Sequence, residues 1–211
     1  MTREGHLDEL LHIFVYLKKQ MNPEMVFDPS IPDIDTNYFQ CQDWIYSIYY
    51  SLGDMLEESF PPNIPTPLGG GFKICCLLDS DHAAKWLTRR SRTGFIVLLN
   101  NAPILWHTKK KSLVETITLR SEFMTMEHAT EYLRVISYKI WMFGIPVDEP
   151  AFVHGENHLV LPNTNLPQST LKKKSQSIAL HFVRDGCAAD EWRIAYINTA
   201  LNVENLMTKT L

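Results

Sequence analysis

Acidic side chains follow several apolar segments of this sequence, at places where they could bind a metal ion. Asp79 comes directly after an apolar run at residues 72–78, and Glu156 follows a second run at residues 151–154. Glu122 lies near the start of a long stretch with helical periodicity. Hard divalent cations such as Mg²⁺ prefer carboxylate oxygens. If the two runs are neighbouring strands, these acids converge where functional side chains of open α/β sheets collect.

Each of these acids also has an ordinary structural interpretation. Asp79 and Asp81 could be acids of a strand-to-loop junction, and Asp81 points to the same side as Asp79 only if the strand continues. Glu122 lies where the helix macrodipole favours a negative charge whatever the function. The residues alone therefore leave the metal site and the structural interpretation both open.

The hydrophobic pattern predicts an α/β fold, because short apolar runs alternate with longer helical stretches. Three strands are followed by a helix, a strand, a helix, a strand and a final helical turn, which is typical of a mixed sheet with helices on its faces. A proline-containing loop is expected between residues 154 and 175. The predicted elements are residues 72–78, 94–99, 103–106, 121–142, 151–154, 175–187, 192–197 and 203–207.

A proline- and glycine-rich stretch divides the chain. Residues 61–71, PPNIPTPLGGG, can form neither a helix nor a central strand, so we expect a linker there. It separates a short, mainly helical segment at residues 1–60 from a domain at residues 72–211. The first segment carries helical spacing at residues 7–15 and an aromatic run at residues 44–56, which predict two helices, with the aromatic side chains packed rather than stacked on bases.

Composition and charge exclude several classes of protein. The 211 residues are 45% hydrophobic and 21% charged, which is typical of a globular protein. No signal sequence or transmembrane stretch is recognisable, so we expect a protein of the cytoplasm or the nucleus, neither secreted nor membrane-bound. Residues 1–72 hold 3 basic and 11 acidic side chains, whereas residues 73–211 hold 17 and 13. The mildly basic second part is compatible with a polyanionic partner.

Cysteine and histidine spacing does not indicate a zinc site. The cysteines form no CxxC motif, and we expect buried, reduced thiols at Cys41, Cys75, Cys76 and Cys187. The stretch HGENH at residues 154–158 lacks the HExxH order and follows a strand, so a loop is the better interpretation. His181 is interpreted as a structural histidine.

Seven short motifs follow one another along the second part of the chain. They are LDSDHA at 78–83, TRRSRTG at 88–94, APILW at 102–106, SEF at 121–123, STLKKK at 169–174, HFVR at 181–184 and NLMTK at 205–209. Each motif alone is weak, but together they resemble the ribonuclease H domain of copia-type LTR retrotransposon polyproteins. Residues 6–19 and 26–29 resemble the connection segment that precedes this domain, and the Tyr-x-Asp-Asp motif of the polymerase is absent.

The resemblance implies an RNase H-like mixed five-stranded sheet with helices on both faces, and a site built from four positions. In the family, such sites hydrolyse the RNA strand of RNA–DNA hybrids with two Mg²⁺ (or Mn²⁺) ions. The matching positions here are Asp79, Glu122, Glu156 and Asn205, of which Asp79, Glu122 and Glu156 would bind the metal ions.

Two of these positions depart from the family pattern. Glu156 replaces an Asp, and its extra methylene displaces the carboxylate by roughly 1 Å, enough to impair a metal pair. Asn205 also replaces an Asp and contributes no charge, while Ala84 replaces a glycine. We therefore expect hydrolysis to be weakened or lost, which leaves the chain's status as an enzyme open. The alternative is a non-catalytic module that binds nucleic acid or protein.

Basic clusters could contact nucleic-acid phosphates. We single out Arg89, Arg90 and Arg92, and give less weight to the lysines at residues 109–111 and 172–174, because such clusters are commonly solvated surface charge. RNA-containing duplexes are recognised by shape and backbone. The expected partners are an RNA–DNA hybrid or another duplex, and a polymerase module of a reverse transcriptase.

Overall fold

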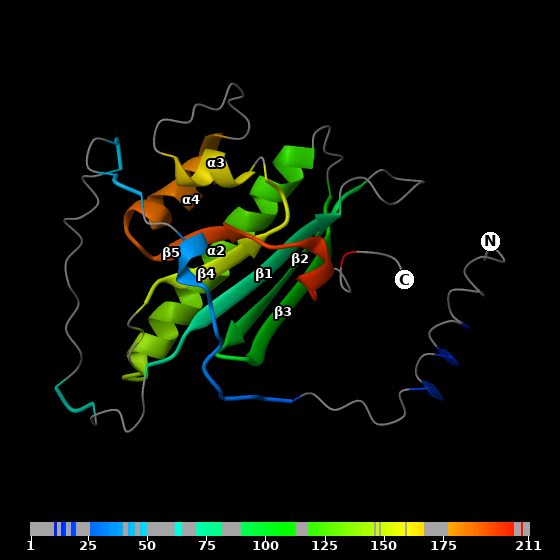
Figure 1. Ribbon diagram of the computed structural model, residues 1–211, viewed down its shortest axis with the longest axis horizontal. Coiled ribbons are helices and arrows are strands. Elements are labelled where there is room, and N and C mark those ends of the chain that lie inside the picture. The colour runs from blue at the N-terminus through cyan, green and yellow to red at the C-terminus, as the bar shows by residue number, and fades with distance from the viewer. Residues whose placement is uncertain are drawn as a thin grey trace.

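The structure is a computed structural model, and it describes the part of the chain that forms the predicted sheet and its helices (Figure 1). The described residues are 11, 14–15, 18–19, 26–39, 42–44, 47–49, 62–64, 71–81, 90–112, 118–145, 147, 149–158, 160–166, 177–204 and 208. Most of the predicted linker lies outside these residues, so the domain boundaries stay a prediction. Among these residues, no helix has the length and apolarity needed to cross a membrane.

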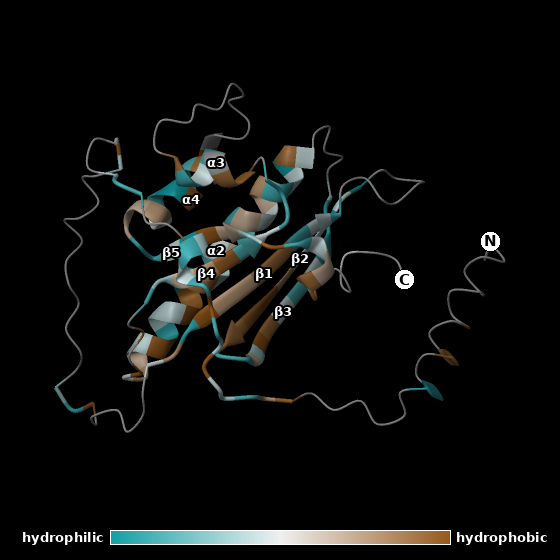
Figure 2. Cartoon of the chain, in the orientation of Figure 1, coloured by the Kyte–Doolittle hydropathy of each residue, from teal (hydrophilic) through white to brown (hydrophobic). Residues whose placement is uncertain are grey.

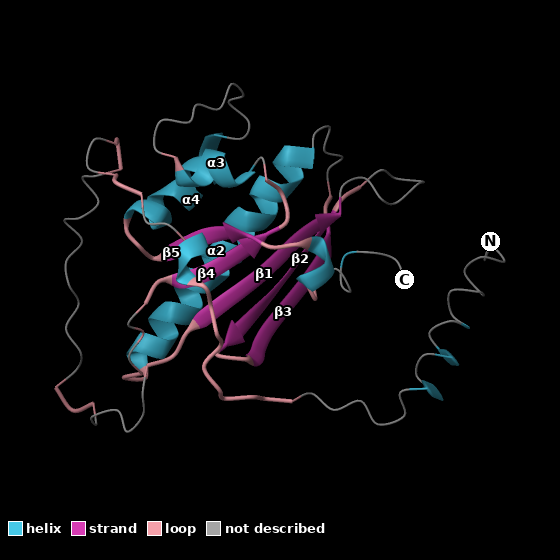
Figure 3. Ribbon diagram, in the orientation of Figure 1, coloured by secondary structure: helices cyan, strands magenta, loops and turns pink. Residues whose placement is uncertain are grey.

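Five strands form one mixed sheet, as predicted (Figure 3). They are β1 (Ile74–Asp81), β2 (Arg92–Leu99), β3 (Ala102–Lys110), β4 (Ala151–Gly155) and β5 (Trp192–Tyr196). Their order is β3-β2-β1-β4-β5, with antiparallel pairing among β1, β2 and β3 and parallel pairing of β4 with β1 and with β5. β1 therefore lies at the centre, which explains its nearly continuous apolar sequence.

Helical elements cover both faces of the sheet. The α-helices are α2 (Thr118–Met142), α3 (Val160–Asn165) and α4 (Ser177–Ala188), and the 3-10 helices are η1 (Thr36–Tyr38) and η4 (Thr199–Leu201). α3 was not predicted, because a proline such as Pro162 commonly indicates a loop. Proline is tolerated in the first turn of a helix, where its missing N–H has no partner to lose.

The main core lies between the sheet and the α-helices. Side chains at helical spacing on α2, including Phe123, Met126 and Leu133, pack against alternate β1 residues such as Cys76 and Leu78. Figure 2 shows the hydrophobic colouring concentrated along β1 and β2. This alternation defines which β1 side chains face the helices, and so also which face the opposite side.

The opposite face of the sheet is covered by the segment around η1. Phe39 is buried and packs edge-on against Phe152 with ring centroids 4.8 Å apart, next to Cys75 and Ala195. In Figure 1 this segment lies in front of the sheet while α2 runs behind it. Part of the N-terminal region is thus packed directly on the sheet.

The aromatic run before the predicted linker contributes to packing. Trp44 and Tyr49 are buried, with ring centroids 5.6 Å apart, and the Tyr49 hydroxyl is hydrogen-bonded to the ring of His181 on α4. The packing interpretation is confirmed for these two residues, and His181 has the structural role expected. Residues 47–49 form a turn rather than a helix, and most of that predicted helix lies outside the described residues.

A tight hairpin joins β2 and β3 at Asn100-Asn101, as the sequence predicts. Asn100 has a φ of 54°, a conformation that asparagine tolerates better than most residues. Its side chain accepts a hydrogen bond from the Lys73 backbone N–H (3.0 Å) and donates one to the Pro29 carbonyl (2.9 Å). The hairpin is thereby tied to the segment that precedes η1.

The described cysteines are free thiols, as predicted. Burial raises the pKa of Cys75 to about 11 and that of Cys187 to about 12, and it also raises the pKa of Cys76. Thiolate is the reactive form of cysteine, so these thiols are poor nucleophiles at neutral pH. Cys41 lies outside the described residues.

A ring cluster between β3 and α2 makes stability depend on pH. His107 stacks on Phe95 at 5.0 Å, and its pKa is lowered by burial and by the nearby His128 and Lys109. The unfolded chain then binds the proton more tightly than the folded chain, so stability should fall as the pH drops below about 6.5. Replacing His107 with Phe should reduce this dependence, as measured by urea unfolding between pH 5 and 7, while His154, whose pKa is also lowered by burial, retains the rest of the slope. An unchanged slope would contradict the assignment.

Candidate active site

The first-strand acid and the acid after β4 lie at the same end of the sheet. β1 and β4 are parallel neighbours with Leu78 opposite Gly155, so Asp79 and Glu156 each follow one member of this pair. The two strands are neighbours, as the expected convergence of these acids requires. Asp79 and Glu122 are only 5% and 6% exposed, yet both open onto a shared cavity. The cavity, of about 450 Å³, is lined by Asp79, Ser80, Asp81, Glu122, Glu156, Asn157 and His158.

Contacts between β1 and the first turns of α2 position Glu122. Ser80 faces α2, and its hydroxyl is hydrogen-bonded to the Ser121 hydroxyl. From the end of β3, Lys111 Nζ donates to the Ser121 carbonyl at 2.8 Å and lies 3.2 Å from its Oγ. Thr125 Oγ1 donates to the same carbonyl at 2.9 Å. Three elements therefore fix the helical turn that carries Glu122 at the cavity.

Hydroxyl groups from the C-terminal part of the chain hold two of the carboxylates. The Thr208 hydroxyl donates to Asp79 Oδ2, and Thr199 Oγ1 donates to Glu156 Oε2 at 3.0 Å. A hydrogen bond to a carboxylate fixes its orientation. Glu156 is thus directed toward η4. Neither threonine contact was anticipated from the sequence.

The described residues 202–204 and 208, here called the C-terminal strap, lie on the face of the sheet opposite α2. Asn202 Nδ2 donates to the Leu78 carbonyl at 3.1 Å, and Glu204 is fully buried. The Glu204 carboxylate lies against Gly94, the register partner of Asp79, where a Cβ would lie 2.6 Å from its Cδ and even closer to Oε1. Gly94 therefore provides the space that this carboxylate occupies.

Asn205, the fourth predicted position, lies outside the described residues. Of the residues on either side of it in the sequence, Glu204 lies against Gly94 of β2 and Thr208 is hydrogen-bonded to Asp79 of β1. Of the four positions, the structure thus brings Asp79, Glu122 and Glu156 to one cavity. Their roles as metal ligands stay predictions.

The cavity has side chains of the kind that bind a hard divalent cation, but their arrangement does not bring enough of them together. Its four carboxylates, including Asp81, are oxygen ligands of the kind that Mg²⁺ and Mn²⁺ prefer. Among the residues that the structure describes, however, no three His, Cys, Asp or Glu side chains are grouped closely enough to hold one ion.

The histidines beside the cavity do not form a zinc site with Glu156. Burial lowers the pKa of His154 to about 4, and its ring packs edge-on against Phe39 at 4.9 Å, on the face of the sheet that carries η1. His158 stacks on Tyr196, with ring centroids 3.6 Å apart. Both rings are engaged in packing. The interpretation of residues 154–158 as a loop is wrong for His154 and Gly155, which belong to β4 because the strand extends to Gly155.

Basic side chains border the cavity on the side of β2 and β3. Arg92 is the register partner of Asp81 on β1 and of Lys110 on β3, and Arg90 is exposed just before it. Arg89 lies outside the described residues. A separate groove of about 630 Å³ runs between β3 and α2, here called the basic groove, and it also contains two acids. Its lining is Thr93, Lys109, Lys110, Lys111, Ser112, Arg120, Met124, Glu127, His128 and Glu131.

Sequence comparison finds distant relatives among retrotransposon polyproteins. The chain is 23% identical over 143 residues to the Retrovirus-related Pol polyprotein from transposon RE2 of Arabidopsis thaliana, and equally to that from transposon RE1. Each match covers 68% of this chain and 10% of the polyprotein, so the chain spans a small part of these relatives. No family model matches the chain.

Structural comparison identifies the fold. The chain is similar to LC11-RNase H1 solved in complex with RNA/DNA hybrid, with a TM-score of 0.50 and 14% identity, covering 64% of this chain and 94% of that one. A second structure of LC11-RNase H1, isolated from compost by a metagenomic approach, gives 0.51 and 13%, covering 64% and 92%. The chain therefore has an RNase H-like fold and is distantly similar to copia-type Pol polyproteins.

Proposed function

We propose that the chain is a retroelement-derived RNase H-like domain that binds RNA–DNA hybrids with Mg²⁺ or Mn²⁺ and cleaves the RNA strand weakly or not at all. The observation that carries the proposal is the shared cavity of Asp79, Glu122 and Glu156 at the ends of two parallel strands. In a site of this kind, bound cations activate a water molecule and stabilise the leaving oxygen.

The residues of the chain supply orientation and charge to this proposed site. The hydroxyl groups of Thr208 and Thr199 orient the carboxylates of Asp79 and Glu156, and Ser121 holds the helical turn that carries Glu122. Two nearly buried carboxylates gain stability from a bound cation, because burial removes water from their charges. Arg92 and the basic groove add positive charge nearby, where a phosphate backbone could bind.

Two features support weakened hydrolysis. Glu156 carries one methylene more than the family's Asp and is hydrogen-bonded to Thr199. Asn205 brings no charge to the fourth position. A two-metal site depends on its full set of acids, since each carboxylate offsets repulsion and desolvation of the ions.

The test is incubation of the purified chain with a labelled RNA–DNA hybrid in Mg²⁺ and, separately, in Mn²⁺. We expect little cleavage, and the Asp79→Asn variant should reduce any residual rate by at least about tenfold. Asp33→Asn, an exposed acid far along the chain from the cavity, is the matched control and should leave the rate unchanged. Robust wild-type cleavage that disappears in Asp79→Asn would show that the site is not weakened.

A non-catalytic module is the second candidate, and the basic groove favours it. In that case the chain binds a hybrid or an RNA duplex, the affinity falls steeply with salt, and no cleavage occurs in either metal. Binding that is identical with and without divalent cations would favour this candidate. Absence of binding to any duplex at low salt would contradict both.

A further inference from the structure

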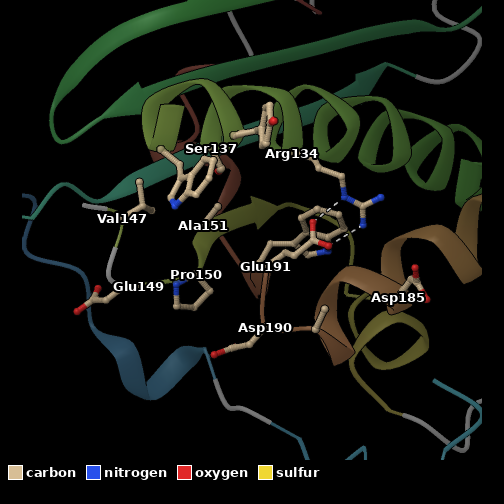
Figure 4. A pocket seen from close by; sticks show the side chains of 13 residues that line it. Arg134, Ser137, Val147, Glu149, Pro150, Ala151, Asp185, Asp190 and Glu191 are labelled. Atoms are coloured by element: carbon tan, nitrogen blue, oxygen red, sulfur yellow. Dashed lines mark hydrogen bonds and ion pairs between the residues drawn. The ribbon is translucent and has the colours of Figure 1, made fainter. Parts of the chain in front are cut away.

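A second cavity lies at the opposite end of the parallel strands from the carboxylates (Figure 4). It is here called the aromatic groove, has a volume of about 620 Å³ and lies where β4 and β5 begin, beside the C-terminal half of α2. β4 is five residues long, which separates the two sites by roughly 15 Å. A volume of this size is typical of ligand-binding pockets.

Aromatic and apolar side chains of α2 form one wall of the groove and continue beyond it. Tyr138 and Trp141 stack with ring centroids 5.8 Å apart, and Tyr138 is 51% exposed. Val135 and Met142 lie three residues before and four residues after Tyr138, on the same side of the helix, and both are half exposed. An exposed apolar stripe that runs into a cavity marks an interaction surface.

The charges around the groove favour a basic partner. Four acids line it, Glu149, Asp185, Asp190 and Glu191, against one lining base, Arg134. Glu149 and Asp190 pair with basic side chains of the chain at 3.3 and 2.8 Å. Such partly exposed pairs are weak, so a ligand can replace their partners at little cost.

Arg134 demonstrates how the groove binds a guanidinium group. Its charged group lies over the rings of Phe182 and Trp192, 4.7 and 5.2 Å from their centroids. It also donates two hydrogen bonds to Glu191, at 2.7 and 2.9 Å, drawn as dashed lines in Figure 4. Aromatic faces combined with carboxylates stabilise cations from both sides.

We propose that the aromatic groove docks a linear, Arg- or Lys-containing peptide segment of a partner protein. Its basic side chains contact Asp185 and the neighbouring acids, and its apolar side chains lie along the stripe of Val135, Tyr138 and Met142. The proposal does not depend on hybrid binding, because the groove shares no residue with the carboxylate cavity.

The test uses a fluorescently labelled peptide of alternating Arg and Leu residues, with an otherwise identical Glu–Leu peptide as its counterpart. Fluorescence anisotropy should show saturable binding of the Arg peptide alone. Tyr138→Ala should weaken this binding about tenfold, because aromatic anchors dominate such interfaces, and Asp185→Asn should weaken it several-fold. Tyr38→Ala, which removes an aromatic side chain that is 73% exposed on η1, should have no effect.

Equal binding of the two peptides, or binding that survives Tyr138→Ala, would overturn the proposal. Circular dichroism melts verify that the variants fold, at the exposed Tyr138 and at the half-buried Asp185. Light scattering tests a second copy of the chain as the occupant. A wild-type dimer that Tyr138→Ala converts to a monomer, and that the Arg peptide does not dissociate, would assign the groove to self-association instead.

Discussion

The double variant Glu156→Asp/Asn205→Asp is expected to cleave an RNA–DNA hybrid about a hundredfold faster than the unmodified chain in Mg²⁺. Shortening residue 156 removes its reach to Thr199, 3.0 Å away, and places a carboxylate nearer to Asp79 and Glu122. Aspartate at position 205 adds the missing charge. A misplacement of roughly 1 Å at a reacting centre lowers rates by about a hundredfold, which corresponds to about 2.7 kcal/mol of transition-state stabilisation.

Initial rates on a labelled hybrid, measured across Mg²⁺ concentrations, give the comparison. The triple variant that also carries Asp79→Asn should return to background, which separates restored chemistry from a contaminating nuclease. Each single variant should give a smaller gain, because ligands of one site act together. If the double variant cleaves no faster than the wild-type chain, the four-position site is not the one that the resemblance implies.

Gly94→Ala is expected to lower the free energy of unfolding by about 3 kcal/mol, a large effect for one methyl group. The new Cβ would overlap the buried Glu204 carboxylate, which cannot move toward the strand. The C-terminal strap must then shift away from β1, and this loosens the Asn202 and Thr208 contacts. Urea unfolding followed by circular dichroism measures the change.

A double-mutant cycle with Glu204→Ala tests the cause. The copia-type domains that the chain resembles have alanine at the position of Glu204, directly before the fourth site position. This substitution removes the carboxylate that the new methyl group would meet. In that background Gly94→Ala should cost far less, giving a coupling of roughly 2 kcal/mol. Equal costs in both backgrounds would mean that the methyl group clashes with the strand rather than with the strap.

Local patterns in the sequence predicted most of the fold. The Asn100-Asn101 turn and the flanking apolar runs predicted the β2–β3 hairpin, and helical periodicity predicted α2 to within three residues of its start. α3 was not predicted because proline is tolerated in the first turn of a helix but disrupts a helix beyond that turn. The sequence alone does not show which case applies to Pro162. The strands β1 and β3 extend farther than predicted, since their polar ends pair within the sheet.

The site was only partly predictable, because its contacts join distant parts of the chain. The convergence of Asp79 and Glu156 depended on β1 and β4 being neighbours, which spacing alone does not decide. The hydrogen bonds to Asp79 and Glu156 come from threonines, a residue type too common to stand out. Glu204 differs from the alanine of the copia-type domains that the chain resembles, but its burial beside Gly94 is visible only in the structure.

The C-terminal strap also determines when the carboxylate cavity forms during folding. Asp79 and Thr208 are 129 residues apart, and Asn202 and Leu78 are 124 apart, whereas the β1–β2–β3 hairpins form through nearby contacts. Closing such long loops is slow, because chain entropy must be lost before any contact compensates. We expect hydrogen exchange to protect β1 and β2 early in refolding and the strap late. The cavity would then be the last region to assemble and the first to open under mild denaturation.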